Sequence, residues 1–208
     1  MTSTASVPTS HFAVDAAAYI QRLQDSFSPA IIEAIEMLAQ ELLRAWTEGR
    51  HVYICGNGGS AANAIHMAND FHYGIGACGA GPRLPGLRVE ALPANASIIT
   101  CLANDTGYDN IYAHQLQVKG RKDDILIVLS GSGNSTNVVL ALETAKQLGI
   151  KSFAILAFSG GRCLELADIP IHFTIDDMQI AEDTQLVVGH LCMQWLNANK
   201  PNSLNELL

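Results

Sequence analysis

The sequence has few basic side chains, few aromatic ones and no long uninterrupted apolar run. Only 12 of its 208 residues are Lys or Arg, against 20 Asp or Glu, so the formal net charge is −8. This balance argues against a protein that binds the phosphate backbone of a nucleic acid, because such a protein needs a basic face. No apolar stretch reaches the roughly 18 residues that a membrane-spanning helix needs. We therefore expect neither a nucleic acid nor a membrane as partner.

Cysteine is also scarce, and no two cysteines have the spacing of a zinc-binding or redox motif. The five cysteines include no C-x-x-C pair, and several lie in apolar segments. We expect buried free thiols rather than a disulfide framework, as is usual in a reducing compartment. The first residues, MTSTASVPTS, lack the basic and apolar regions of a signal peptide. These features favour a cytoplasmic protein.

The rest of the composition fits one globular domain. With 49% hydrophobic residues, the chain can bury a sizeable core. We expect disorder in residues 1–10 and a single domain over residues 11–208. Two helical patterns, at 11–26 and 29–48, precede an alternation of apolar strands with helices. Such an alternation predicts a parallel, doubly wound α/β sheet that is covered on both faces. The strands are expected at 51–55, 87–92, 125–129, 152–158 and 169–175, and the helices that follow them at 60–72, 95–102, 109–118, 134–148, 162–167 and 179–197.

Two of these strands run directly into glycine- and serine-rich loops that begin a helix. HVYIC (51–55) is followed by GNGGS, and ILIVL (125–129) is followed by SGSGNS. Such loops aim backbone N–H groups and the positive end of a helix dipole at one point. Neither loop contains the lysine of a nucleotide-binding P-loop. Both loops lie at carboxyl ends of strands, where doubly wound sheets bind ligands, so we expect a small phosphorylated ligand.

Two helices carry histidine together with a carboxylate. His66 and Asp70 are four residues apart and share a helix face, and Glu182 and His190, eight apart, lie within about 80° of each other. These residue types transfer protons at carbon or bind a metal ion, and their spacing leaves both roles open. Structural roles stay open too: an acidic first turn for Glu182, and helix N-caps for Ser60 and Asn134.

The segment 74–86, GIGACGAGPRLPG, holds five glycines and two prolines. We expect a mobile loop here. Loops of this kind often carry function, and a surface excursion without a role is the alternative.

Four segments together form a wider pattern. They are GNGGSAANAIHMANDF (56–71), CLANDTGYDNIYAHQL (101–116), LSGSGNSTNVVLALETAKQLG (129–149) and AEDTQLVVGHL (181–191). This pattern resembles the sugar isomerase (SIS) domain family and, within it, the phosphoheptose isomerases, over about residues 30–198. The resemblance implies a three-layer α/β/α sandwich with a five-stranded parallel, flavodoxin-like sheet plus N-terminal helices. It also implies a homotetramer whose sites lie between subunits.

The resemblance further implies roles for individual residues. Proton transfer falls to Asp70 and His190. Some members bind zinc through the residues that match His66, Asp70, Glu182 and His190, so one Zn²⁺ per site is the cofactor to test, and no nucleotide cofactor is implied. The residues implied to bind the substrate are Asn57, Gly58, Ser60, Asp105, Ser130, Ser132, Ser135 and Glu182.

The sequence departs from the family at three positions. Asp70 replaces a glutamate, Glu182 stands where glutamine is usual, and Gly74 stands where the family has an arginine. Arg83 in the segment 74–86 is a substitute for that arginine to consider. The departures leave the identity of the substrate more open than the type of reaction.

We therefore expect aldose–ketose isomerisation of a phosphosugar through an enediol. The implied substrate is D-sedoheptulose 7-phosphate, and the product is D-glycero-D-manno-heptose 7-phosphate. Three alternatives stay open: an isomerase of another phosphosugar, a non-catalytic tetrameric adaptor that binds the replication initiator protein, and a phosphosugar-sensing module. The adaptor ranks below the enzyme because Asp70 and His190 are present, and the sensor because its usual DNA-binding domain finds no segment here.

Overall fold

The structure, a computed structural model, describes residues 11–79, 81 and 83–201. The disorder predicted for residues 1–10 lies outside the described residues. A sheet of five parallel strands has the order β2-β1-β3-β4-β5. This is the flavodoxin-like doubly wound order, so the predicted fold class is confirmed. The strands are β1 (His51–Gly56), β2 (Arg88–Ala91), β3 (Ile125–Ser130), β4 (Lys151–Leu156) and β5 (Ile169–His172).

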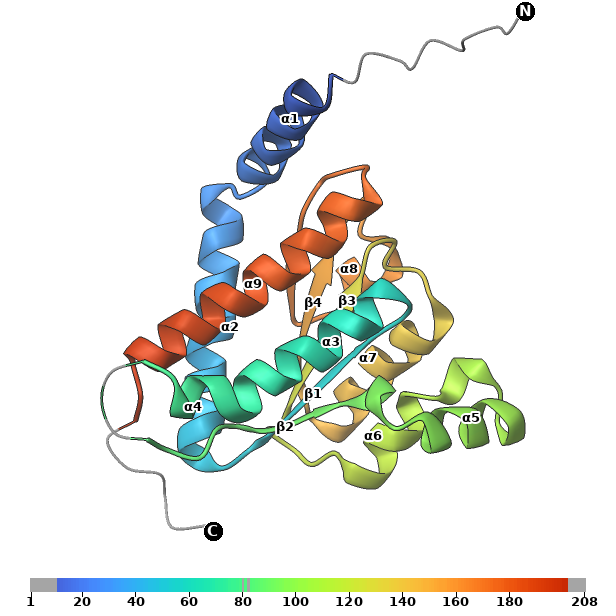
Figure 1. The fold of residues 1–208 in the computed structure, drawn as a ribbon. Coiled ribbons are helices and arrows are strands. Elements are labelled where there is room, and N and C mark those ends of the chain that lie inside the picture. The colour runs from blue at the N-terminus through green and yellow to red at the C-terminus, as the bar shows by residue number, and fades with distance from the viewer. Residues whose placement is uncertain (1–10, 80, 82, 202–208) are drawn as a thin grey trace, which may run out of the picture.

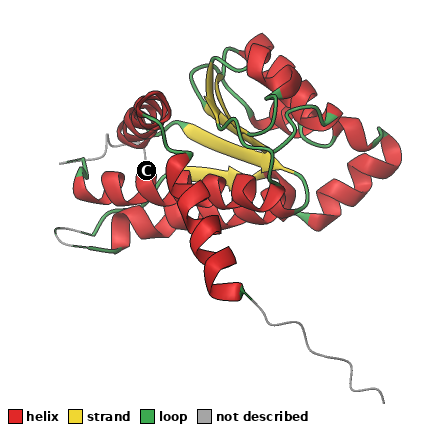
Figure 2. Ribbon diagram, turned by 90° about the horizontal axis from the view of Figure 1, so that it is seen from above, coloured by secondary structure: helices red, strands yellow, loops and turns green. Residues whose placement is uncertain are grey.

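Helices cover both faces of the sheet and make it the middle of three layers (Figures 1 and 2). The side chains of β1 alternate between two cores, because successive residues of a strand point to opposite faces. Val52 and Ile54 belong to the core shared with α2, α3 and α9, whereas Tyr53 and Cys55 belong to the core shared with α6, α7 and α8. The described helices are α1 (Phe12–Asp25), α2 (Pro29–Glu48), α3 (Gly59–Asn69), η1 (Asp70–Gly74), α4 (Ile75–Ala77), η2 (Leu92–Ala94), α5 (Ala96–Asp105), η3 (Tyr108–Asn110), α6 (Ala113–Lys119), α7 (Thr136–Leu148), α8 (Gly161–Leu166) and α9 (Met178–Ala198).

The long helix α2 has clear start and stop signals in its sequence. Ser28 caps its N-terminus by accepting a hydrogen bond from the backbone N–H of Ile31, and Pro29 occupies the first helical position. Gly49 ends the helix with a left-handed φ of 70°. The buried face of α2 includes Leu38 and Leu42, which have no exposed surface. This helix therefore packs on the sheet, whereas α1 does not.

Helix α1 stands away from the sheet (Figure 1). None of its residues is buried, and Phe12, Val14 and Ile20 are each more than 60% exposed. Polar contacts join it to the rest of the chain: Tyr19 donates to Asp183, and Arg22 pairs with Asp177, the residue before α9. The apolar face of α1 is consequently left open in the single chain.

The segment 74–86 differs from the predicted loop at its beginning. The chain passes from α3 through the π-helical turn η1 into α4, so residues 74–77 are helical rather than loop. Ile75 is fully buried and lies in the same core as Phe71, which explains why the helix continues past its glycines. The backbone then returns along the helix, where the N–H of Leu84 donates to the carbonyl of Gly76. The mobility of the remaining segment stays a prediction.

All five cysteines are free thiols, but only three of them are buried. Cys55, Cys163 and Cys192 lie in the two cores, and burial raises the pKa of each thiol. Cys78 and Cys101 are exposed, contrary to the general expectation of buried thiols. Along the described part of the chain, no helix is both long and apolar enough to cross a membrane.

Candidate active site

The candidate site lies along the seam where α3 packs beside α9. The two helices run in the same direction: residues further along α3 contact residues further along α9. At the start of the seam, the side chain of Gln185 donates to the Ser60 hydroxyl at 3.0 Å and accepts from Asn63. Further along, Gly189 lies so close to Met67 that a Cβ on this glycine would be 2.8 Å from the Met67 Cγ. This close approach brings the polar side chains of both helices together.

His66, Asp70 and His190 form the central cluster of this seam. The Nε2 atoms of the two imidazoles are 2.9 Å apart, and the Asp70 Oδ2 lies 3.4 Å from His66 Nε2 and 3.6 Å from His190 Nε2. The predicted sharing of one helix face by His66 and Asp70 is therefore confirmed. Both imidazoles are about half exposed, and 19% of the Asp70 side chain is exposed. A substrate can reach all three groups.

The donor set of this cluster suits two kinds of chemistry. A carboxylate between two imidazoles can remove a proton from carbon and exchange protons with neighbouring oxygens. The three groups also offer ligand atoms that all lie within 4.8 Å of one another, as a divalent metal ion requires. Two nitrogens and one oxygen would leave a coordination position open, as in catalytic zinc sites. The residues present therefore fit such an ion.

The serine loops lie at the carboxyl ends of β1 and β3, which are neighbours in the sheet. In the second loop, the Ser130 hydroxyl accepts from the N–H of Gly133 at 3.1 Å, and the Ser132 hydroxyl accepts from the N–H of Asn134 at 3.3 Å. Both hydroxyls keep their own proton to donate, and Ser132 is exposed. Ser135 precedes α7 without using its hydroxyl as a cap. The arrangement leaves hydroxyl donors and first-turn N–H groups for an anion.

The alternative role of Ser60 and Asn134 as helix N-caps is not what the structure shows. Helix α3 is preceded by Gly58, whose φ of 55° turns the chain into the helix, and Ser60 lies inside the first turn. Asn134 lies one residue before the cap position of α7. Its amide instead joins the second loop to α8, because its Oδ1 accepts from the N–H of Arg162.

Asn57 joins the first serine loop to the first turn of α7. Its side chain and that of Asn137 exchange two hydrogen bonds of 2.8 Å, and its Oδ1 also accepts from the hydroxyl of Tyr108 at 3.0 Å. Sequence reasoning missed Asn137, Tyr108 and Gln185. Their spacing along the chain gives no signal, since the Asn57–Asn137 pair is 80 residues apart. Only the position of Gln185, one turn beyond Glu182 on the same helix, could have suggested its role.

Glu182 and Asp105 are predicted site residues that lie outside the central cluster. The carboxylate of Glu182 lies against Gly59 in the first turn of α3, where a Cβ on this glycine would be 2.3 Å from its Oε1. Within one chain, the structure groups three of the four predicted metal ligands, because eight residues of helix separate Glu182 from His190 by roughly 12 Å along the axis. The place of Glu182 among the ligands stays a prediction. Asp105 is exposed at the end of α5 and accepts from Cys101 and Asn104, within its own segment.

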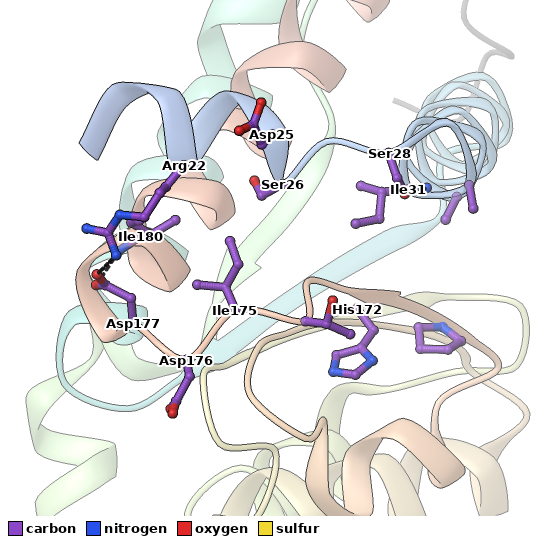
Figure 3. Close-up of a pocket in the computed structure, with 14 residues that line it drawn as sticks. Arg22, Asp25, Ser26, Ser28, Ile31, His172, Ile175, Asp176, Asp177 and Ile180 are labelled. Atoms are coloured by element: carbon purple, nitrogen blue, oxygen red, sulfur yellow. Dashed lines mark hydrogen bonds and ion pairs between the residues drawn. The ribbon is translucent and has the colours of Figure 1, made fainter. Parts of the chain in front are cut away.

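A cavity of about 670 Å³ lies in another part of the chain, between α1, the start of α2, β5 and the segment before α9 (Figure 3). Arg22 and Asp177 form a 2.8 Å ion pair among its lining residues (Figure 3). None of the predicted site residues lines this cavity. We place the site at the seam of α3 and α9 nonetheless, because the seam carries the cluster of titratable side chains and begins at the first serine loop.

Comparisons with known proteins agree with this fold and with these motifs. Residues 15–157 match the SIS domain family. The phosphoheptose isomerase of Clostridium acetobutylicum is 34% identical over 162 residues, which cover 77% of this chain and 79% of that protein. Phosphoheptose isomerase 2 of Campylobacter jejuni is 34% identical over 185 residues, covering 87% of this chain and 86% of that protein. A solved phosphoheptose isomerase from Francisella tularensis superposes with a TM-score of 0.81 at 26% identity, covering 89% of this chain and 96% of that chain.

Proposed function

Because the chain belongs to the SIS domain family and, within it, to the phosphoheptose isomerases, we propose that it converts D-sedoheptulose 7-phosphate to D-glycero-D-manno-heptose 7-phosphate. The observation that carries the proposal is the cluster of His66, Asp70 and His190 on the helix seam that begins at a serine loop. The cluster supplies acid–base groups, and the loop supplies donors for a phosphate. A phosphosugar isomerase needs both at once.

The serine loops hold the phosphate in this proposal. Hydroxyls of Ser60, Ser130, Ser132 and Ser135 surround the first turns of α3 and α7, and Asn57 with Gly58 shapes the first loop. Neutral donors of this kind bind a phosphate well at a helix N-terminus. The energy of this contact, made far from the reacting carbons, fixes C1 and C2 against the acid–base groups. Asp105 is proposed to line the sugar, with Tyr108 tying its segment to Asn57.

The isomerisation moves one hydrogen between two neighbouring carbons. A base of the cluster removes a proton from C1 of the ketose, the C2 oxygen gains a proton, and an enediol forms. A proton then returns to C2 while the C1 hydroxyl loses its own, which gives the aldose. Asp70 and His190 are the proposed groups, because the carboxylate lies within 3.6 Å of the imidazole and can exchange protons with it through the substrate.

A divalent ion, zinc by the family resemblance, fits beside these groups. His66, Asp70 and His190 would hold it, and it would polarise the substrate carbonyl. A bound cation would also compensate the close approach of the two imidazole nitrogens. Glu182, the fourth predicted ligand, lies outside this cluster within the single chain.

The proposal further takes residues 11–208 as one domain in a cytoplasmic homotetramer. The exposed apolar face of α1 supports the assembly, since the single chain leaves Phe12, Val14 and Ile20 uncovered. The length of α3 supports sites shared between subunits. Asp70 follows Ser60 by ten residues, about 15 Å along the axis, which is far for one short sugar to span within one chain.

The direct test is a coupled assay of the purified protein against a panel of ketose phosphates, with and without added zinc. Asp70→Asn should lower turnover of the preferred substrate by roughly a hundredfold or more, since general acid–base groups contribute that much. Asp176→Asn, an exposed aspartate outside the seam, is the matched control and should keep full activity. Wild-type turnover in Asp70→Asn would contradict the mechanism. The non-catalytic adaptor would then be the better-supported function.

A further inference from the structure

A basic pocket lies at the end of the sheet opposite to the serine loops. It has a volume of about 330 Å³ and sits where β1, β2 and β3 begin. The site proposed above uses the carboxyl ends of β1 and β3, so this pocket is separated from it by the length of the strands. The residues that line it are Gly49, Arg50, His51, Arg88, Lys119, Arg121 and Asp124.

The charge of this pocket is opposite to that of the chain. Four of the 12 Lys and Arg residues line it, while the whole chain carries a net charge of −8. The single acidic residue of the lining, Asp124, is already committed, because its two oxygens accept from the backbone N–H groups of His51 and Arg121. Glu90 pairs with Lys119, and Glu48 pairs with Arg50, so two further charges are offset beside the pocket. A positive surplus remains, carried mainly by the arginines.

The guanidinium groups of Arg88 and Arg121 are each held in place through one nitrogen. Arg88 donates through Nη1 to the carbonyl of Gly49 at 3.2 Å, and Arg121 donates through Nη1 to the carbonyl of Gly120 at 2.9 Å. These bonds satisfy carbonyls at the ends of α2 and α6. Among the described residues, the other N–H groups of Arg88 and Arg121 have no protein acceptor. Capping these carbonyls uses one nitrogen of each arginine. The remaining N–H donors are fixed in position and can bind a ligand.

The imidazole of His51 is affected by the positive charge of the same pocket. The pKa of its imidazole is lowered by burial and, next in size, by Arg88, while Asp124 and Glu90 act against the shift. The neutral form of the ring is consequently favoured. A neutral imidazole adds a donor or an acceptor to the pocket without adding a repulsive charge to it.

From this arrangement we infer that the basic pocket binds a small polyanion with at least two phosphate groups. Arginine forks from two elements, with Lys119 beside them, suit a ligand with several oxygens on neighbouring phosphorus atoms. A single phosphate is already served by the serine loops. The pocket is a hollow of limited size rather than a stripe, so it lacks the extended basic face that a nucleic acid needs.

The test uses inorganic pyrophosphate as the probe, free of divalent ions, in titration calorimetry with the full chain. The double variant Arg88→Gln, Arg121→Gln should bind pyrophosphate roughly tenfold more weakly or worse, because each arginine offers charge-assisted hydrogen bonds. The control, Arg44→Gln with Lys146→Gln, removes the same charge elsewhere and should bind as the wild type does. Isomerase turnover should stay unchanged in both, which separates this inference from the proposed function.

Hydrogen exchange on the wild-type protein gives a second readout that needs no variant. Pyrophosphate should slow exchange in residues 118–124 and 48–51 more than in 130–136. Binding that survives in the arginine variant but disappears in Ser60→Ala with Ser132→Ala would overturn the inference, as would protection confined to 130–136. Equal losses in the arginine variant and its charge control would also overturn it. So would tight binding of duplex DNA with no binding of pyrophosphate, since it would mark an extended polyanion surface.

Discussion

At the scale of single residues, Glu182 places a negative charge beside the first serine loop. Its carboxylate lies against Gly59, in the first turn of the helix that begins at the first serine loop. A negative group is stabilised there by the helix dipole, but it also occupies the field that a phosphate would use. Glu182 therefore opposes the ligand that the loops otherwise attract.

Replacing Glu182 by glutamine should raise the affinity for a sugar phosphate. Removing one charge near a helix N-terminus changes the binding energy by about 0.3–1 kcal/mol, which is roughly a two- to fivefold effect. Calorimetric titration at low ionic strength measures it, with Glu165→Gln on the exposed side of α8 as control. A weaker affinity in Glu182→Gln, accompanied by loss of a bound metal, would instead place this carboxylate among the metal ligands.

His51 makes stability depend on pH. Burial and Arg88 hold the folded-state pKa of its imidazole below the ordinary 6.5, so the unfolded chain binds the proton more readily. The free energy of unfolding should therefore fall as the pH drops below 6.5. Urea titrations between pH 7.5 and 5 should show a smaller decline for His51→Gln than for the wild type. His72→Gln, at an exposed position, should follow the wild type; an identical slope in all three proteins would rule out this role.

At the scale of elements, the seam between α3 and α9 depends on the absence of a side chain at Gly189. An added methyl group would be 2.8 Å from the Met67 Cγ, inside a packed core. The two helices would move apart, and the imidazoles of His66 and His190 would separate with them. The catalytic cluster and the core packing are thus coupled through one contact.

Gly189→Ala should destabilise the fold by about 1–3 kcal/mol, the usual cost of overpacking. It should also lower turnover more than Gln194→Ala, a change on the exposed side of the same helix. Thermal unfolding and the coupled assay measure the two effects. Adding Met67→Ala removes the clash and should restore part of the activity; without such recovery, the spacing of the seam is not what the glycine controls.

Most of the helices and strands could be predicted from the sequence. Apolar runs gave the strands, and the stop at Gly49 gave the end of α2, because local burial and local turns decide both. The turn η1 could not be foreseen, since it depends on Phe71 and Ile75 reaching the same core. Nor could the pair of Asn57 and Asn137, or the basic pocket, because residues distant along the chain meet there only after the sheet has formed.

At the scale of the whole molecule, the open apolar face of α1 and the length of α3 point to shared sites. Mixing Asp70→Asn subunits with Ser60→Ala subunits, each impaired alone, should restore partial activity, because some sites would combine an intact loop with an intact cluster. Light scattering at micromolar concentration should show tetramers for both parents. Mixed tetramers without activity would rule out the shared site, and a stable monomer would rule out the assembly.

The parallel course of α3 and α9 has one more consequence. Both helices start at the same end of the seam, so their dipoles add rather than cancel, although Asp177, which caps α9, weakens the field of that helix. An elongated ligand with a negative charge at one end has a lower energy when that end faces the N-termini of the two helices than when the ligand is reversed. The scaffold itself therefore distinguishes head from tail before any hydroxyl touches the ligand.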